Sequence, residues 1–272
     1  MEKILVTGSK GMLGCDLCPI LKKEGYKVIE TDIDNLDITN FLIVEKMLLK
    51  HNPNIIIHLA AYTDVDKAED NMETARKINF EGTKNLAKIC SKLDIKLIYI
   101  STDYVFDGLK NSPYEPQDTP NPINNYGLTK LGGENAIKKY CKNYIIARTS
   151  WLYGIYGKNF VETMLKLSNK ENLKVVNDQT GCPTWTKDLS NALIKLIKED
   201  KNGIFHVCSS GQTTWYNFAK EIFNQMNLKV NISPCTTEEF KSTAKRPKYS
   251  VMNNNNIIRN WKSALYEYLE LR

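Results

Sequence analysis

Short apolar runs alternate with longer segments of helical spacing along the first half of the chain. Runs of four or five mostly apolar residues predict buried strands at Lys3–Thr7, Lys27–Thr31, Ile55–His58, Lys96–Ile100 and Tyr144–Arg148. Between them, apolar side chains recur every three or four residues, which predicts helices at Met12–Glu24, Phe41–His51, Ala68–Leu93 and Tyr126–Lys142. This alternation indicates an α/β fold, with a parallel sheet covered by helices on both faces.

From about residue 151 the pattern is looser, and shorter elements are separated by aromatic, Gly- and Asn-rich stretches. We expect a strand at Gly203–Cys208, a loop at Asn253–Asn256, and helices at Asn159–Asn169, Thr186–Glu199, Thr214–Met226 and Trp261–Leu271. The sequence therefore predicts a sheet domain over residues 1–150. Residues 151–272 are expected to form mainly a smaller substrate-binding lobe, with some segments returning to the first domain.

The chain has 272 residues, a length that suits a nucleotide-binding domain with a smaller second lobe. Its formal net charge of +6 is compatible with an anionic substrate such as a nucleoside diphosphate, although a Lys- and Asn-rich proteome would explain the same balance. No block of Lys and Arg alternates with aromatic residues, so we expect no nucleic-acid partner.

Seven cysteines are scattered along the chain, and Cys15 and Cys18 form a C-x-x-C. With no second such pair and only three histidines, a zinc site lacks ligands, and we expect no metal. Buried free thiols are the better interpretation, and they indicate a reducing cytoplasm. No leader pattern and no apolar run of membrane-spanning length is present, so the sequence predicts a cytoplasmic protein with no membrane partner.

The first strand leads directly into Thr7-Gly8-Ser9-Lys10-Gly11-Met12-Leu13-Gly14, which opens the first helix. Gly8 allows the tight turn out of the strand, Gly11 allows close approach of a pyrophosphate, and Gly14 allows the helix to pack closely. The amino end of the helix offers free N–H groups and a positive dipole end to phosphates. In this strand–loop–helix context the glycines predict a Rossmann-type, doubly wound domain that binds a dinucleotide.

Asp32 follows the second strand at about the distance expected of the acid that binds an adenosine ribose. A carboxylate there hydrogen-bonds the 2′-hydroxyl and repels a 2′-phosphate, so we favour NADH, with NADPH as the alternative. A plain solvated Asp at a strand end would look the same. Asp37 and Ile38 come shortly after and are candidates for contact with the adenine.

Two further segments carry groups suited to carbonyl reduction. The fourth strand leads into Ser101-Thr102-Asp103-Tyr104, which places a Thr hydroxyl at the carboxyl edge of the sheet. Tyr126 and Lys130 are spaced i, i+4, which puts both side chains on one face of a helix. Alone, such a pair is usually a surface pair, but its position after the glycine loop and the strand end favours a catalytic role.

Reduction of a ketone needs a hydride on carbon and a proton on oxygen. A free tyrosine has a pKa of about 10 and is a weak acid at neutral pH. A nearby ammonium and the positive nicotinamide favour the ionised form, so we expect the pKa of Tyr126 to be lowered. Lys130 can also hold the nicotinamide ribose, and Thr102 can donate a hydrogen bond to the same carbonyl oxygen.

Together these residues resemble the extended short-chain dehydrogenase/reductase superfamily and, within it, the dTDP-4-dehydrorhamnose reductase family. The resemblance covers nearly the whole chain. Its more specific segments are Ala60-Ala61-Tyr62-Thr63-Asp64-Val65-Asp66-Lys67-Ala68-Glu69, Ser101–Phe106, Tyr126–Lys130, Arg148-Thr149-Ser150-Trp151-Leu152-Tyr153-Gly154, Asn177-Asp178-Gln179-Thr180-Gly181-Cys182-Pro183-Thr184, Thr213-Thr214-Trp215-Tyr216 and Arg246-Pro247.

The resemblance implies an NAD(P)H-dependent reduction of the 4-keto group of dTDP-4-dehydro-L-rhamnose to dTDP-L-rhamnose. It implies that Tyr126 is the proton donor, with Lys130 and Thr102 assisting, and that Asp103 and Trp151 meet the sugar. It implies cofactor contacts from Gly11, Met12, Leu13, Asp32, Asp37, Ile38, Ala61, Tyr62 and Thr63.

The sequence departs from this family at two places. Tyr62 stands where the family often has His. Some members are magnesium-bridged dimers with interface acids; Asp16 matches one, but Lys187 stands where another acid is expected. We therefore predict no required metal and leave a homodimer open.

Other aromatic and basic residues have two interpretations. Trp185 and Trp215 are expected in the core, since aromatic side chains usually are, and only Trp151 is favoured for the pocket. Arg246 is expected either to bind the substrate diphosphate through its forked donors or to form a salt bridge.

Alternative functions remain open. A 4,6-dehydratase needs an acidic pair after the Thr, and here Asp103 is followed by Tyr104. A 4-epimerase, or a reductase of a related keto-deoxysugar, is compatible with the sequence. A non-catalytic dinucleotide-binding regulatory subunit is a further alternative, and retention of Thr102, Tyr126 and Lys130 counts against it.

Overall fold

A six-stranded parallel sheet forms the centre of the protein, whose computed structural model describes residues 1–170 and 172–272. Its order is β10-β5-β4-β3-β1-β2. The strands are β1 (Lys3–Thr7), β2 (Lys27–Thr31), β3 (Ile55–His58), β4 (Lys96–Thr102), β5 (Tyr144–Thr149) and β10 (Gly203–His206). Since β2 and β3 flank β1, the winding reverses between β1 and β3, and a crevice forms outside the carboxyl ends of these strands.

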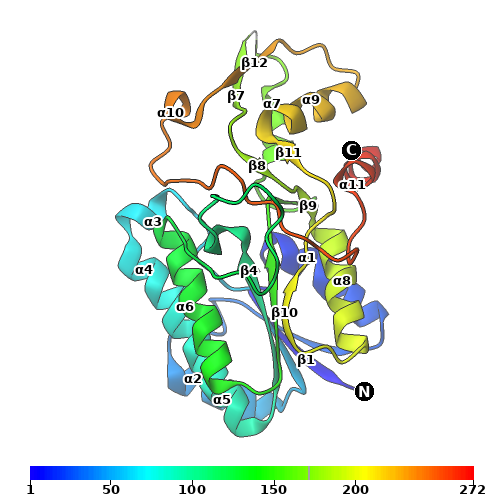
Figure 1. Ribbon diagram of the computed structural model, residues 1–272. Helices are drawn as coiled ribbons and strands as arrows, with labels where there is room; N and C mark the ends of the chain where they lie inside the picture. The colour runs from blue at the N-terminus through cyan, green and yellow to red at the C-terminus, as the bar shows by residue number, and fades with distance from the viewer. Residues whose placement is uncertain (171) are drawn as a thin grey trace.

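Helices cover both faces of this sheet, as the alternation of apolar and polar residues predicts (Figure 1). One face carries α1 (Met12–Lys23) and α8 (Thr186–Lys198). The other carries α2 (Phe41–His51), α5 (Thr83–Leu93) and α6 (Asn125–Tyr140). Strand side chains on both faces are buried, since Ile4, Leu5 and Val6 are all 0% exposed, which explains the continuous apolar runs.

The prediction of a single long helix at Ala68–Leu93 is wrong. The segment divides into α3 (Lys67–Asp70), α4 (Met72–Arg76), a π-helical turn η1 (Lys77–Gly82) and α5. Asn71 interrupts the first two because its backbone leaves the helical region, with φ −122° and ψ 43°. The π turn directs the Asn79 side chain to the backbone of Tyr62, whose N–H it accepts at 2.8 Å. Such turns are frequent at functional sites, and this one holds the loop after β3.

Three strand boundaries also differ from the prediction. Strand β5 continues to Thr149 rather than ending at Arg148. Strand β4 continues to Thr102 rather than ending at Ile100, so Thr102 is the last residue of the strand. Strand β10 ends at His206 rather than Cys208. Beyond His206 the chain leaves the sheet, because Cys208 packs with Val105, Phe106, Tyr114 and Met252 in a separate apolar cluster.

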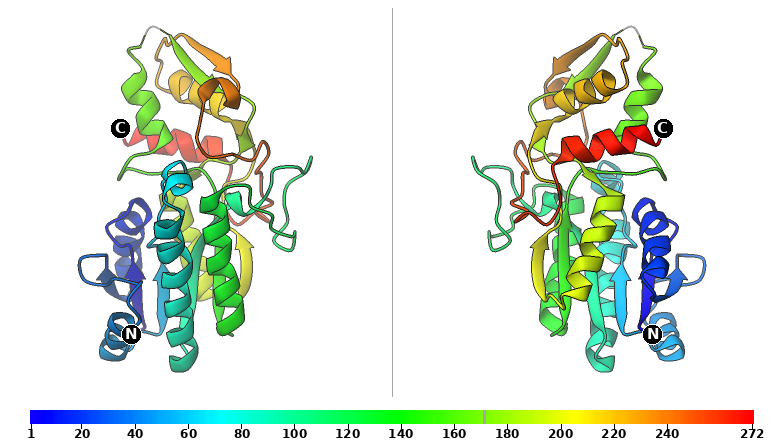
Figure 2. Two further views of the ribbon diagram at one scale, coloured as in Figure 1. Left: turned by 90° about the vertical axis from the view of Figure 1, so that its left-hand side faces the viewer. Right: turned by 90° about the vertical axis from the view of Figure 1, so that its right-hand side faces the viewer.

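The later part of the chain builds a smaller lobe over the carboxyl edge of the sheet (Figures 1 and 2). Its aromatic core includes Tyr153, Trp185, Phe218, Trp261 and Tyr268. Its elements are α7 (Phe160–Leu167), α9 (Trp215–Gln225), α10 (Thr237–Phe240), α11 (Trp261–Glu270), and the paired strands β6 (Leu152–Tyr153) with β9 (Thr184–Trp185), β7 (Leu173–Val176) with β12 (Ile232–Cys235), and β8 (Thr180–Gly181) with β11 (Thr213–Thr214). These short strands were not predicted. The division of the chain at residue 150 stays a prediction.

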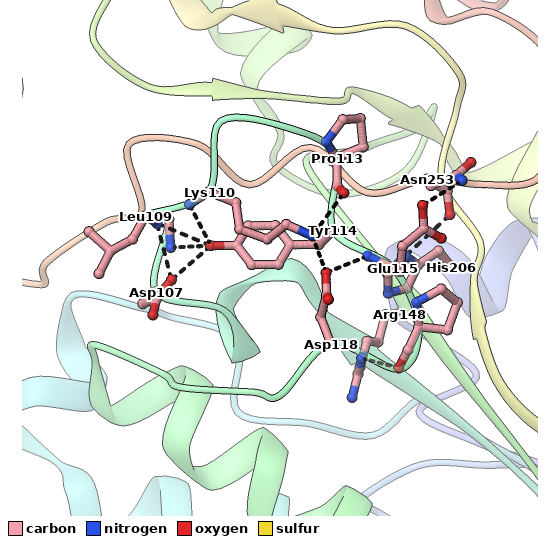
Figure 3. A network of polar contacts seen from close by, with 12 residues as sticks. Asp107, Leu109, Lys110, Pro113, Tyr114, Glu115, Asp118, Arg148, His206 and Asn253 are labelled. Carbon is pink, nitrogen blue, oxygen red and sulfur yellow. Dashed lines mark hydrogen bonds and ion pairs between the residues drawn. The ribbon is translucent and has the colours of Figure 1, made fainter.

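A polar network fixes the long connection between η2 (Asp103–Val105, a 3-10 turn) and α6 (Figure 3). The Tyr114 hydroxyl accepts the backbone N–H groups of Gly108 and Leu109 and donates to Asp107 at 2.7 Å. The Asn253 amide donates to Glu115 Oε1 at 2.8 Å. The connection is thus tied to the segment before α11, beside the carboxyl edge of the sheet.

Two global expectations are tested by the fold. In the part of the chain that the structure describes, no helix is long and apolar enough to cross a membrane. All seven cysteines are free; Cys18 is buried as expected, whereas Cys15 is only partly buried.

Candidate active site

A cavity of about 850 Å³ lies at the carboxyl edge of the sheet, between the sheet domain and the smaller lobe. This volume is typical of a site for a cofactor or small molecule. Its walls come from the glycine loop, the loops after β2 and β3, the end of β4, the start of α6 and residues 149–152. Ile78, Lys158 and Trp215 complete them. The crevice predicted from the topology is therefore present.

The glycine loop has the geometry that was expected of Gly8 and Gly14. Gly8 has φ +68°, and a Cβ on it would lie 2.7 Å from the Ala60 nitrogen. A Cβ on Gly14 would overlap the carbonyl oxygens of Gly8 and Ser9. Helix α1 begins after Gly11, which supplies no side-chain cap, so the first-turn N–H groups of Met12 and Leu13 face the cavity without one. This arrangement fits a pyrophosphate.

Carboxylates lie at the end of β2, where the adenosine part of a dinucleotide was expected. Asp32 lines the cavity and accepts the backbone N–H groups of Lys10 and Ile33 at 3.0 and 2.8 Å. Asp37 also lines it and is held by the N–H and hydroxyl of Thr39. Buried Ile38 completes this wall.

Lys10 was not singled out from the sequence. It lines the same end of the cavity, and its Nζ pairs with Asp34 at 2.8 Å. The adenosine end therefore carries a cation as well as carboxylates.

The loop after β3 contributes two of its three expected residues. Ala61 and Thr63 line the cavity, and Tyr62 does not. The backbone of Tyr62 is bound on both sides by Asn79, which accepts its N–H and donates to its carbonyl at 3.1 Å. The loop is thereby held in place from η1.

Helix α6 places Tyr126 and Lys130 one turn apart in the cavity. Asn124 caps the helix by accepting the Gly127 N–H at 2.7 Å. A Cβ on Gly127 would overlap the Tyr104 carbonyl oxygen, so glycine is needed for the helix to start this close to η2. The tight approach brings Tyr126 to the end of β4, where Thr102 and Asp103 also line the cavity.

The Lys130 ammonium is buried, with 3% of the side chain exposed, and Nζ lies 4.1 Å from the centroid of the Tyr99 ring. Burial lowers the pKa of Lys130 to about 7, against the opposing effect of the Glu134 carboxylate. Burial also raises the pKa of Asp103 to about 7, which hydrogen bonds from Ser250 and Thr102 oppose.

The pKa of Tyr126 is raised rather than lowered, first because the phenol is buried and second because of the nearby Asp103 carboxylate. This contradicts our expectation from the sequence for the protein alone. The reason is that the cost of burying the phenolate exceeds the effect of the Thr102 hydrogen bond, which acts in the opposite direction. Tyr126 is therefore a protonated donor at neutral pH.

A buried ion pair between Glu134 and Arg148 anchors α6 to the sheet. Arg148 donates to both carboxylate oxygens of Glu134, at 2.9 and 2.7 Å, and the Ser101 hydroxyl donates to Glu134 Oε1 at 2.6 Å. Both charged side chains are almost completely buried. Because Glu134 lies one turn after Lys130, the pair joins α6 to β4 and β5 directly beneath the cavity.

Two tryptophans form one wall. Trp151 lines the cavity as expected, in a left-handed conformation with φ +46°. Trp215 also lines it, so the expectation that Trp215 lies only in the core is wrong. It follows the capping residue Thr214 as the first residue of α9, and this directs its ring across the lobe to Trp151. Trp185 is fully buried, as predicted.

Arg246 lies outside the cavity wall. Its guanidinium donates to both oxygens of Asp66, at 3.1 and 2.6 Å, and Asp66 also accepts the Ala244 N–H. Of the two expectations, the salt bridge is the one present in the structure. It ties the segment before α11 to the loop after β3, and contact with a diphosphate stays a prediction.

Lys158 is a further cavity residue that we did not predict. Residues 1–170 and 172–272 hold no cluster of three His, Cys, Asp or Glu side chains suited to a metal. Asp16 is hydrogen-bonded to Thr186, and Lys187 pairs with Glu267 at 2.9 Å. Both side chains are thus engaged within the chain, and the absence of a required metal stays a prediction.

Comparisons with known proteins agree with this geometry. The family described as "RmlD substrate binding domain" matches residues 1–271. The Bacillus subtilis spore coat polysaccharide biosynthesis protein SpsK is 42% identical over 100% of this chain and 98% of its own. The dTDP-4-dehydrorhamnose reductase of Aggregatibacter actinomycetemcomitans is 37% identical over 93% and 90% of the two chains. The structure of the Bacillus anthracis dTDP-4-dehydrorhamnose reductase in complex with NADP aligns with a TM-score of 0.97, at 42% identity, over 100% and 99%.

Proposed function

Because the chain belongs to the RmlD substrate binding domain family, we infer that it is a nicotinamide-dependent reductase. It reduces the 4-keto group of dTDP-4-dehydro-L-rhamnose to give dTDP-L-rhamnose. One observation supports this function above all. Tyr126, Lys130 and Thr102 line the same cavity as the glycine loop and the uncapped amino end of α1.

The residues of the sheet domain fit a dinucleotide, which supplies the hydride when it is bound. The backbone around Gly8, Gly11 and Gly14, with the N–H groups of Met12 and Leu13, holds the pyrophosphate. Asp32, Asp37 and Ile38 hold the adenosine part. Ala61 and Thr63 follow the dinucleotide along the loop after β3. Tyr62 lies outside the cavity wall, and its backbone bonds to Asn79 hold this loop in place.

Tyr126 gives its phenolic proton to the oxygen of the sugar carbonyl. Its raised pKa keeps that proton in place at neutral pH. The tyrosinate left after transfer is stabilised by the Lys130 ammonium, which also holds the nicotinamide ribose. Thr102 donates its hydroxyl to the same carbonyl oxygen, and its position at the end of β4 fixes that hydroxyl in the cavity.

The sugar lies between the end of β4 and the tryptophan wall. Asp103 and Trp151 contact it in this arrangement. We propose that Arg246 contacts the substrate diphosphate. Its guanidinium would then bind the diphosphate and Asp66 at the same time.

A preference for NADH over NADPH is the finer part of the proposal, and the Asp32 carboxylate supports it. The Lys10 ammonium at the same end of the cavity could attract the 2′-phosphate of NADPH, so NADPH is the second candidate cofactor. Asp32→Asn removes the charge and keeps the size. The ratio of kcat/KM for NADPH to that for NADH should rise at least about fivefold in the variant; an unchanged ratio would remove Asp32 from this role.

We also propose a cytoplasmic location, supported by the seven free cysteines. Sedimentation at several protein concentrations decides whether the protein is a homodimer, which we keep as a proposal.

The reaction is tested by mixing the purified protein with NADH and enzymatically generated dTDP-4-dehydro-L-rhamnose. Oxidation of NADH is followed as the loss of absorbance of the reduced nicotinamide. Tyr126→Phe should lower kcat by about a hundredfold or more, the usual contribution of a general acid. Its NADH affinity, measured by titration, should stay within about twofold of wild type. No oxidation by the wild type with NADH or NADPH would overturn the assignment to this sugar.

A further inference from the structure

Lys158 lies on the smaller lobe in a loop that touches the amino end of α1. The loop joins β6 to α7 and contains Gly154 and Gly157. A Cβ on Gly154 would lie 3.2 Å from Met12 Cγ, and one on Gly157 would lie 3.7 Å from Met12 Cβ. Since Met12 is the first residue of α1, the loop covers the helix end where a pyrophosphate fits (Figure 2).

The loop is held firmly at both ends. The Asn159 side chain donates to the Gly154 carbonyl at 2.8 Å and accepts the Glu162 N–H as the cap of α7. The Tyr268 hydroxyl donates to the same Gly154 carbonyl at 2.9 Å. These contacts fix the backbone at Gly154 and at Asn159, the residue that follows Lys158.

Among the lysines that line the cavity, Lys158 is the one that neither an ion pair nor an aromatic ring engages in the described part of the chain. Three lysines line the cavity. Lys10 is paired with Asp34, and Lys130 is buried against the Tyr99 ring. Lys158 is exposed, and within the described part of the chain no carboxylate lies within ion-pair distance of it. A dianionic pyrophosphate at α1 is otherwise met only by backbone N–H groups and the helix dipole.

We propose that Lys158 is a positioning residue that binds the pyrophosphate of the nicotinamide dinucleotide from the smaller lobe, opposite the amino end of α1. The inference rests on the proposed function, because it needs a dinucleotide in the cavity. The cofactor is then held by both parts of the protein, with the glycine loop on one side and the β6–α7 loop on the other. The diphosphate of the sugar nucleotide has the same chemistry and is the alternative ligand.

Binding measurements without turnover test this. NADH, ADP-ribose and dTDP are titrated into wild type, Lys158→Ala, Lys158→Arg and Lys166→Ala. Lys166 is the matched control, because it is exposed on α7, does not line the cavity and carries the same charge. Melting temperatures confirm that the variants are folded.

Lys158→Ala should bind NADH and ADP-ribose about tenfold more weakly, the effect of one charge-assisted contact, and dTDP within about twofold of wild type. Lys158→Arg should restore the affinity, and Lys166→Ala should leave it unchanged. The loss should shrink at about 0.5 M salt, because screening weakens an exposed ion pair.

Unchanged NADH affinity in Lys158→Ala would overturn the inference, and so would a loss confined to dTDP, which would assign Lys158 to the substrate. A wild-type protein that binds neither NADH nor ADP-ribose would instead overturn the proposed function.

Discussion

The indole rings of Trp151 and Trp215 stack face to face, with centroids 3.5 Å apart and planes 7° from parallel. The pair joins the end of β5 to the start of α9. Gln179 accepts the Trp215 Nε1–H at 3.1 Å, and a Cβ on Gly181 would lie 2.5 Å from the Trp151 ring. The segment around residues 179–181 therefore holds both rings in the cavity wall.

Loss of this stack should weaken substrate binding more than chemistry. Trp215→Ala removes the face that supports Trp151, and an aromatic pair contributes about 0.5–1.5 kcal/mol beyond its buried area. We expect the KM for the sugar nucleotide to rise about tenfold, with kcat within about threefold of wild type. Steady-state kinetics at saturating NADH measure both.

Trp215→Phe keeps an aromatic face and serves as the control, with a KM between those of wild type and Trp215→Ala. If Trp215→Ala lowered kcat and left KM unchanged, the stack would act on the reacting groups rather than on binding.

The Glu134–Arg148 pair should behave as a buried ion pair whose members depend on each other. Glu134→Leu or Arg148→Met alone leaves a desolvated charge, which costs about 3–5 kcal/mol of the free energy of unfolding. The double variant Glu134→Leu/Arg148→Met leaves no unpaired charge, and its loss should be smaller than the sum of the single losses. Urea unfolding of the four proteins gives the coupling energy.

Strictly additive losses would show that the two side chains contribute independently, contrary to their bidentate geometry.

Gly14→Ala should damage the phosphate loop. Its Cβ would overlap the carbonyl oxygens of Gly8 and Ser9, so the loop and the start of α1 must separate. NADH affinity should fall at least about tenfold, since the loop backbone supplies the pyrophosphate contacts. Titration with NADH measures the change.

Gly25→Ala is the matched control. Gly25 has φ +88° and no atom within 4 Å of an added Cβ, so the variant should lose about 1 kcal/mol of stability through backbone strain. Its NADH affinity should remain that of wild type. Equal affinities in both alanine variants would contradict the steric role of Gly14.

Acid should destabilise the protein partly through His206, which is 1% exposed. Burial, with the nearby Arg148 charge, lowers the pKa of His206 to about 3. Between about pH 6.5 and pH 3 the unfolded chain takes up a proton at this residue and the native protein does not. The free energy of unfolding therefore falls as the pH falls, by up to about 1.4 kcal/mol per pH unit from this group.

His206→Asn cannot take up that proton. Its free energy of unfolding, measured in urea from pH 4 to pH 6, should fall less steeply with acid than that of wild type. Parallel curves for the two proteins would mean that His206 titrates alike in the folded and unfolded chain.

Periodic apolar patterns predicted the central elements well, because each strand is buried on both faces and each helix on one. The strands β1, β2 and β3 and the helix α2 have the predicted bounds. Ala68–Leu93 was misjudged because its apolar spacing is helical throughout. The backbone nevertheless leaves the helical region at Asn71, and the π turn is tied to the distant Tyr62 through Asn79. The two-residue strands of the smaller lobe are too short to show a period.

Some cavity residues could be predicted from local sequence and others could not. Gly8, Thr102, Tyr126 and Lys130 stand at strand and helix ends, and local pattern locates them. Trp215 and Lys158 reach the cavity only through the packing of α9 and of the β6–α7 loop, which no short sequence window contains. The partner of Arg246, Asp66, is 180 residues away in the chain and is equally hidden.

Residues 186–206 return to the central sheet, so the protein cannot be cut at residue 150 into two independent parts. Strand β10 forms an edge of the central sheet beside β5, and α8 covers the face on which α1 lies. A gene fragment that ended at residue 150 would encode the glycine loop and Tyr126 but would leave Ile145, Ala147 and Leu17 facing water. The two parts therefore cannot be exchanged between relatives as separate modules, and a chimaera must carry residues 186–206 with the amino-terminal half.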